Sequence, residues 1–260
     1  MNKKYIIILL LLIVILAISS FFIIKEFAEN KKETDIYDEL QEIVIEENTD
    51  IDTKNVDTEI EKSEGKSSNK YNLENIAKIN SDVVGWIKIE NTNIDYPVMQ
   101  NGDYYLHKDI YKNYSSHGTP YLAPFCNLKK SDNLIIYGHH MKDNTMFSQL
   151  EKYKNYNFYL NHKYIKFFTI EDGKTIENNY EVMIAFKTIA YSDEGFRYYS
   201  YTDFQNYEDY EEFVENCRNL EFYYTGVVGT HQDKYITLST CEYSQKNGRM
   251  IIVAKKIKKI

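Results

Sequence analysis

The sequence predicts a mainly β domain, folded as a closed or nearly closed barrel and carried by a membrane anchor. Three observations support this fold class. Apolar stretches of strand length recur from residue 83 to the C-terminus, with polar turns between them. Helical patterns are few and do not alternate regularly with strands, as they would in a doubly wound fold. One long apolar run lies at the N-terminus.

The N-terminal run covers residues 5–24, which carry no charge and are dominated by Ile and Leu. Twenty helical residues span about 30 Å, which is enough to cross a bilayer. Lys3 and Lys4 precede the run, so the positive-inside rule predicts that residues 1–4 are cytoplasmic and that the chain after Ile24 is extracytoplasmic. The alternative is a cleaved signal peptide, whose apolar stretch is usually shorter and ends at a small-x-small site. We expect an uncleaved, single-pass signal anchor.

The acidic charge is concentrated in the segment after this run. Residues 25–65 contain fifteen Asp and Glu against five Lys, whereas the chain from Lys66 onward has 24 acidic and 24 basic residues. We therefore expect residues 25–69 to be a solvated, flexible acidic spacer, with a weak amphipathic helix over 36–45 as an alternative, and residues 70–260 to form the folded domain. A neutral domain without a basic stripe does not predict a nucleic-acid partner.

The folded part is expected to begin with one short helix and to continue mainly as strands. Predicted helices cover residues 73–80, 146–153 and 207–220. Predicted strands cover residues 83–89, 91–99 (after an initial turn), 121–123, 134–137, 164–170, 180–190, 235–241 and 249–257. Asp172 and Gly173 mark a hairpin turn. The helix over 207–220 has the clearest apolar stripe, formed by Tyr210, Phe213, Val214 and Cys217.

Three reactive side chains lie where predicted strands end or begin. Cys241 ends one strand, on the same face as Ser239 by the two-residue period. His139 follows a strand that ends at Gly138, and Arg249 opens the last strand. Because only seven residues separate Cys241 from Arg249, antiparallel pairing of the last two strands would put both on one rim of the barrel. No local argument places His139 beside them.

These residue types suit acyl transfer to a thiol. A deprotonated cysteine is a strong nucleophile, and an imidazole can take its proton and later protonate a leaving amine. A permanently charged guanidinium can stabilise a tetrahedral oxyanion. Each residue taken singly also has an ordinary structural interpretation: Cys241 as a small buried hydrophobe, His139 as one of a polar loop pair with His140, and Arg249 as a surface charge.

Three segments resemble the signature segments of the sortase family. They are Thr-Leu-Ser-Thr-Cys at residues 237–241, the following Gly-Arg-Met-Ile-Ile-Val-Ala-Lys-Lys, and Ile-Ile-Tyr-Gly-His-His-Met at residues 135–141. The stretch Asp-Val-Val-Gly-Trp-Ile at residues 82–87 also looks like the family's first strand. The chain resembles class B sortases most closely, over about residues 70–260. This resemblance implies a closed barrel of about eight strands, with an N-terminal helix and a long helix before the cysteine strand.

The resemblance also implies an activity and a set of site residues. Sortases of this class are cysteine transpeptidases that cleave a C-terminal sorting signal similar to Asn-Pro-x-Thr-x after Thr. They pass the thioacyl intermediate to an amine of a cell-wall precursor similar to lipid II. Matching the motifs assigns catalytic roles to His139, Cys241 and Arg249, and substrate-binding roles to Ser239, Glu242, Leu106, Tyr198 and Tyr199. Implied partners are surface proteins that bear sorting signals, the precursor amine and the membrane.

Alternative functions remain to be weighed. A peptidoglycan L,D-transpeptidase uses similar chemistry but typically carries a His-Gly-Cys cluster, where this chain has Ser-Thr-Cys. A pilin-polymerising sortase would use a pilin lysine as acceptor, and often carries a lid loop and a C-terminal membrane segment. An inactive sortase-like binding module would not need the complete set of Cys, His and Arg.

The remaining reactive residues predict no additional site. Three cysteines are too few for a disulfide framework, and an odd count leaves at least one free thiol. We expect Cys126 and Cys217 to be structural. The six histidines show no paired metal-ligand spacing, no acidic cluster predicts calcium binding, and no glycine-rich phosphate loop occurs, so we expect no metal and no cofactor.

Overall fold

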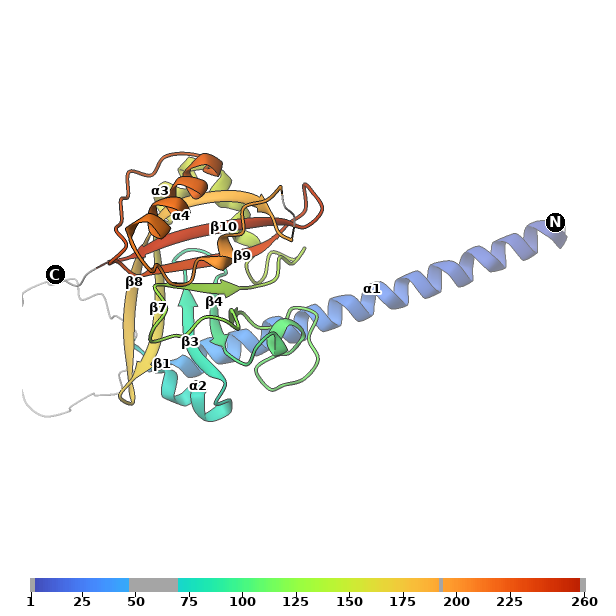
Figure 1. Ribbon diagram of the computed structural model, residues 1–260. Coiled ribbons are helices and arrows are strands. Elements are labelled where there is room, and N and C mark those ends of the chain that lie inside the picture. Colours follow the sequence, from blue (N-terminus) through green and yellow to red (C-terminus); the bar gives the residue numbers. More distant parts are fainter. Residues whose placement is uncertain (1–2, 47–69, 192–193, 258–260) are drawn as a thin grey trace, which may run out of the picture. The chain divides into compact units, whose positions relative to one another are not determined.

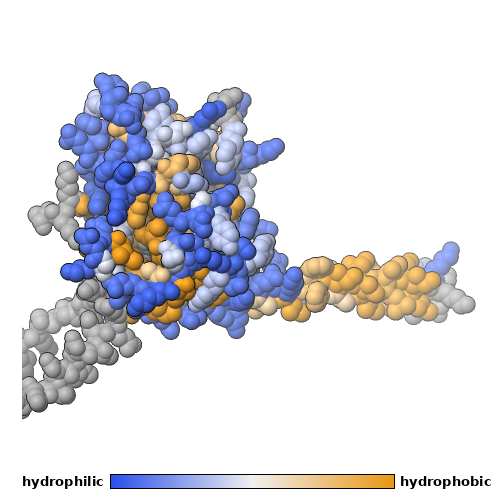
Figure 2. Space-filling model, turned by 60° about the horizontal axis from the view of Figure 1, so that its bottom comes forward, coloured by the Kyte–Doolittle hydropathy of each residue, from blue (hydrophilic) through white to orange (hydrophobic). Residues whose placement is uncertain are grey.

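The computed structural model describes residues 3–46, 70–191 and 194–257, and the chain divides into two compact units, Met1–Glu39 and Leu40–Ile260. The first unit is formed by the helix α1 (Lys3–Val44), which continues into the second unit. The side chains of residues 5–24 are all exposed, and Figure 2 shows them as a nearly unbroken apolar surface. Among the described residues, α1 is the one helix long and apolar enough to cross a membrane. It fits a single-pass membrane anchor.

The helix does not end with the apolar run, because α1 continues to Val44. The expectation of a flexible coil is therefore wrong for residues 25–44. This part is rich in Glu, Lys and other good helix formers, and Lys25 and Glu29 form an i, i+4 ion pair of 3.6 Å. Within the second unit, Leu40 and Val44 are fully buried, so packing stabilises the last turn. Residues 47–69 of the predicted spacer lie outside the described residues.

The second unit is built on a closed barrel of eight strands in the order β10-β8-β7-β3-β4-β5-β6-β9, which confirms the predicted fold class. Figure 1 labels β3, β4 and β7 to β10 of this barrel. The strands are β3 (Val83–Lys88), β4 (Asp95–Met99), β5 (Tyr121–Leu122), β6 (Asn133–Tyr137), β7 (Tyr164–Glu171), β8 (Lys174–Ile189), β9 (Tyr235–Glu242) and β10 (Gly248–Lys256). All neighbouring pairs are antiparallel except β4 with β5 and β6 with β9. Each predicted strand is therefore present, but β8 begins at the hairpin turn and is longer than expected.

Short elements connect and cover the barrel. They are β1 (Ile45–Glu46), which pairs with β2 (Lys70–Tyr71), and then α2 (Leu73–Ile79), the 3₁₀ helices η1 (Tyr104–His107), η2 (Ser148–Lys154) and η3 (Tyr198–Ser200), α3 (Tyr156–Asn161) and α4 (Tyr207–Leu220). α4 has the predicted bounds, since Asn206 caps its N-terminus and Tyr210, Phe213 and Cys217 are buried. The helix predicted over 146–153 is instead the 3₁₀ helix η2.

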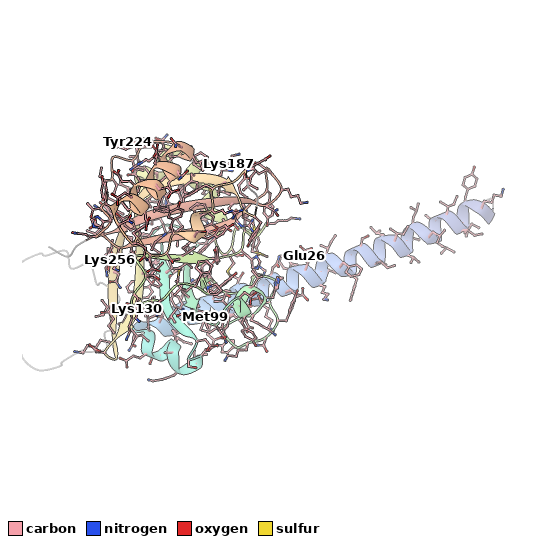
Figure 3. All side chains as sticks on the ribbon, in the orientation of Figure 1. Glu26, Met99, Lys130, Lys187, Tyr224 and Lys256 are labelled. Atoms are coloured by element: carbon pink, nitrogen blue, oxygen red, sulfur yellow. The ribbon has the colours of Figure 1, made fainter. Side chains whose placement is uncertain are left out.

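Three strand termini lie at one end of the barrel: β6 ends at Tyr137, β9 ends at Glu242, and β10 begins at Gly248. Lys187 of β8, labelled in Figure 3, lies at this end, and its Nζ is 3.2 Å from Ser244 Oγ in the β9–β10 connection. Lys256, at the other terminus of β10, lies toward the opposite side of the barrel in the same view.

Candidate active site

Cys241 and Arg249 are direct cross-strand partners in the β9–β10 hairpin. Side chains at opposed positions of an antiparallel pair point to the same face, so the predicted sharing of one rim is confirmed. The Arg249 guanidinium donates to the Gly248 carbonyl at 2.9 Å and lies 5.7 Å from the centre of the Tyr191 ring. Tyr191 is 77% exposed, so this contact between cation and ring lies at the surface of the domain.

The parallel pairing of β6 with β9 brings His139 to the same rim. The register pairs Tyr137 with Ser239, and the Gly138 amide donates to the Ser239 carbonyl at 3.1 Å. His139 and Cys241 each lie two residues beyond this pair of partners, so both follow strand ends at the same rim. This supplies the connection that the sequence alone could not, because β6 and β9 are separated by about a hundred residues along the chain.

Neighbouring groups hold the His139 ring in place. Its Nε2 lies 2.7 Å from the Leu106 carbonyl oxygen, and its ring stacks on the ring of His107 with centroids 5.6 Å apart. The His107 ring stacks in turn on Tyr114 at 6.3 Å. A carbonyl oxygen only accepts hydrogen bonds, so Nε2 carries the hydrogen and Nδ1 is the nitrogen left to accept a proton.

The surroundings of His139 favour its neutral form. Burial is the strongest influence lowering its pKa, and positive charge on His107 and His117 lowers it further, whereas the hydrogen bond to Leu106 acts in the opposite direction. The resulting pKa lies below the ordinary value of 6.5. At neutral pH the ring is therefore mostly neutral and able to act as a base.

His140, to which the motif match assigns no role, contacts the strand that carries Cys241. Its Nδ1 lies 2.9 Å from the Cys241 carbonyl oxygen. The Tyr243 hydroxyl donates to the His140 carbonyl at 3.0 Å, and the two rings are 5.0 Å apart. The adjacent pair of histidines in the sequence was the available signal, but only the fold shows what the second one touches.

Ser239 and Tyr198 meet on the face of β9 that carries Cys241. Their hydroxyl oxygens are 2.7 Å apart, and both residues are buried. The Tyr199 ring packs edge-on against Tyr198 at 5.4 Å and lies 6.1 Å from Tyr191, which faces Arg249. The structure thus gathers these predicted substrate-binding residues next to the rim, although the Ser239 hydroxyl is already bonded to Tyr198.

The other two predicted substrate-binding residues have different surroundings. Leu106 contributes its backbone carbonyl to His139, a contact that side-chain patterns do not reveal. Glu242 alternates with Cys241 along β9 and is buried, with Lys154 at 2.8 Å and Ser244 Oγ at 2.6 Å from its carboxylate. Burial opposes its ionisation, but these hydrogen bonds prevail and lower its pKa. Substrate binding by Leu106 and Glu242 stays a prediction.

The three cysteines are free thiols in different environments. Burial raises the pKa of Cys126 to about 11 and also raises that of Cys217, which is fully buried in α4. Both are therefore weak nucleophiles near neutral pH. Cys241 is partly exposed, so among the cysteines it is the one a substrate can reach.

Comparison with known proteins places this geometry in a family. The model of the Sortase domain matches residues 87–257. Two curated relatives are both called Sortase B. The protein of Staphylococcus aureus is 36% identical over 192 residues, covering 72% of this chain and 75% of the relative, and that of Listeria monocytogenes is 33% identical over 240 residues, covering 90% and 89%.

Solved structures give the same result. A substrate complex of Staphylococcus aureus sortase B matches with a TM-score of 0.63 and 37% identity, covering 72% of this chain and 84% of that chain. Clostridium perfringens sortase B matches with a TM-score of 0.64 and 33% identity, covering 72% and 100%. Sortase B of Bacillus anthracis in complex with AAEK1 has a TM-score of 0.68 and 26% identity, covering 90% and 100%.

Proposed function

This chain belongs to the sortase family, is of class B and is a transpeptidase, and from that premise we propose a specific reaction. Cys241 cleaves a C-terminal sorting signal similar to Asn-Pro-x-Thr-x after Thr. The resulting thioacyl-enzyme passes the surface protein to an amine of a cell-wall precursor similar to lipid II. The observation that carries this proposal is the register of β6, β9 and β10, which supports convergence of His139, Cys241 and Arg249 on one rim.

The proposed chemistry follows from the state of each group. His139 accepts the Cys241 proton at Nδ1, since its Nε2 donates to Leu106. The thiolate attacks the Thr carbonyl carbon, and Arg249 stabilises the oxyanion, an interaction typically worth about 3–4 kcal/mol. The C–N bond then breaks as the His139 proton moves to the leaving nitrogen, which leaves a thioester on Cys241.

The second half of the reaction reverses these proton movements. An acceptor amine attacks the thioester carbonyl and gives its proton to His139. The C–S bond breaks, a new amide forms, and the proton returns to the Cys241 sulfur. Water in place of the amine would release the free acid, so hydrolysis is the side reaction of this site.

The proposed topology follows from the anchor. Residues 1–4 are a cytoplasmic tip, residues 5–24 span the membrane, and the domain of residues 70–260 acts on the outer side. The helical continuation to Val44 supports a stiffer connection from the membrane than the expected coil over residues 25–69. This topology would bring the site to substrates and precursors that are held at the same membrane surface.

The test uses the full chain in detergent micelles with peptides in which x is varied in Asn-Pro-x-Thr-x. Mass spectrometry follows cleavage after Thr and transfer to two acceptors, triglycine and lysine. We expect transfer to an added amine, and loss of both reactions to background in Cys241→Ala. Cleavage that persists in this variant would contradict the proposal. Strong preference for lysine would favour a pilin-polymerising enzyme, and peptide binding without cleavage would indicate an inactive binding module.

A further inference from the structure

The hydrogen-bond ladder between β6 and β9 changes character next to Cys241. The last backbone rung runs from the Gly138 amide to the Ser239 carbonyl. In a regular parallel ladder two further rungs would follow, first from the Cys241 amide to the Gly138 carbonyl and then from the His140 amide to the Cys241 carbonyl. Here the side chain of His140 occupies that place, with Nδ1 2.9 Å from the Cys241 oxygen.

The chain leaves the ladder because it turns to pair elsewhere. The Phe147 amide donates to the His139 carbonyl at 2.9 Å, and His140 forms an isolated antiparallel bridge with Met146. The segment that carries His139 is thus held on one side by residues 146–147. On the side of β9, the His140 ring supplies a contact where a backbone rung would otherwise lie.

A second contact runs in the opposite direction. The Tyr243 hydroxyl donates to the His140 carbonyl, and its ring packs on the His140 ring at 5.0 Å. Tyr243 is two residues beyond Cys241 and is 69% exposed. Two side-chain hydrogen bonds therefore join the segment of His140 to the end of β9. One is made by the His140 ring and the other by the Tyr243 hydroxyl.

We propose that His140 is a positioning residue that sets the location of the His139 ring relative to the Cys241 sulfur. The inference rests on the proposed function, since it concerns the proton transfer between these two groups. A carbonyl oxygen accepts only, so Nδ1 of His140 donates, and it carries a hydrogen in the imidazolium and in one neutral tautomer alike. The contact thus works without a charge on the ring. A displacement of about 1 Å at a reacting pair can cost about a hundredfold in rate. Loss of the hydrogen bond from His140 to the Cys241 carbonyl should therefore affect turnover more than substrate affinity.

Two variants of similar size separate the donor from the shape of the ring. Asn carries an amide N–H at about the position of Nδ1, whereas Leu fills similar space without a donor. We expect His140→Leu to lower kcat about tenfold or more with KM within twofold of the wild type. We expect His140→Asn to restore kcat to within about threefold, and Tyr243→Phe, which removes only the hydroxyl, to have a smaller effect of the same kind.

The measurements are steady-state cleavage of the sorting-signal peptide, the rate of Cys241 alkylation by iodoacetamide, and thermal unfolding of each variant. The alkylation rate should fall in His140→Leu and recover in His140→Asn, because it reports thiolate formation without substrate. A wild-type kcat in His140→Leu would overturn the inference. Equal losses in the Leu and Asn variants, or a rise in KM alone, would also overturn it. These outcomes count when the wild type cleaves and Cys241→Ala does not, which keeps them distinct from failure of the proposed function.

Discussion

Replacing Gly138 with alanine should displace the segment that carries His139, because a Cβ at this position would meet the ring of Phe147. An ideal Cβ would lie 2.6 Å from Phe147 Cγ, 2.7 Å from Cδ2 and 3.0 Å from Cδ1. Carbon atoms in contact are normally about 3.5–4.0 Å apart. Phe147 is fully buried, and the closest atom is the one that attaches the ring to its Cβ, so rotation of the ring does not relieve the overlap.

The added Cβ would lie about one ångström closer to the Phe147 ring than a normal carbon–carbon contact, and this overlap allows an estimate of the loss in stability and rate. Overpacking of a buried site typically costs about 1–3 kcal/mol, and we expect this loss in the free energy of unfolding of Gly138→Ala. If the backbone of His139 moves to relieve the overlap, kcat should fall by about 10- to 100-fold. The assays are denaturant unfolding of the second unit and cleavage kinetics of the sorting-signal peptide.

Two further variants make this prediction specific. Phe147→Leu removes part of the ring, so the double variant with Gly138→Ala should lose less stability and kcat than the two single effects combined. Gly173→Ala is the matched control. Gly173 has a φ of +72° and nothing within 4 Å of an added Cβ, so alanine there should cost about 1 kcal/mol of stability and leave kcat unchanged. Wild-type stability and kcat in Gly138→Ala, or additive effects in the double variant, would refute the steric argument.

Two other residues give independent predictions. In an NMR titration His139 should have a pKa below 6.5, mainly because of burial, and His107→Gln should raise that pKa by removing a neighbouring positive charge. With a lowered pKa, His139 binds a proton less readily in the folded chain than in the unfolded chain, so the free energy of unfolding falls as the pH drops below 6.5. This loss should be smaller in His107→Gln. An unchanged His139 titration in that variant would contradict the influence of His107. Cys217→Ala should lower the free energy of unfolding by about 1 kcal/mol and leave cleavage at the wild-type rate, because the thiol is buried in α4; reduced cleavage at full stability would contradict its structural role.

Local patterns in the sequence were sufficient for elements whose formation depends on near neighbours. The helix at Tyr207–Leu220 has the predicted bounds because its cap, its charges and its apolar stripe agree. The hairpin that sets Cys241 opposite Arg249 was also predictable, since a short connection between two strands leaves antiparallel pairing as the simple solution. Motif resemblance added His139, whose place in space no local pattern encodes.

Other features depended on contacts between distant segments. The acidic stretch after the apolar run was expected to be coil, but helix formers and burial of Leu40 and Val44 extend α1. η2 replaces the predicted α-helix, and β8 extends back to its hairpin turn. The roles of the Leu106 carbonyl and of His140 in holding the site also lay outside what residue types could indicate.

The sequence by itself determined the barrel class, the apolar anchor and the three reactive groups at strand termini. Only the tertiary structure decided that β6 lies parallel to β9, that the Leu106 carbonyl bonds Nε2 of His139, and that the His140 ring contacts the Cys241 carbonyl. The physical reason is the distance along the chain over which each kind of interaction acts. Periodicity and turns act over a few residues, whereas a rung between segments about a hundred residues apart exists only after the barrel has closed.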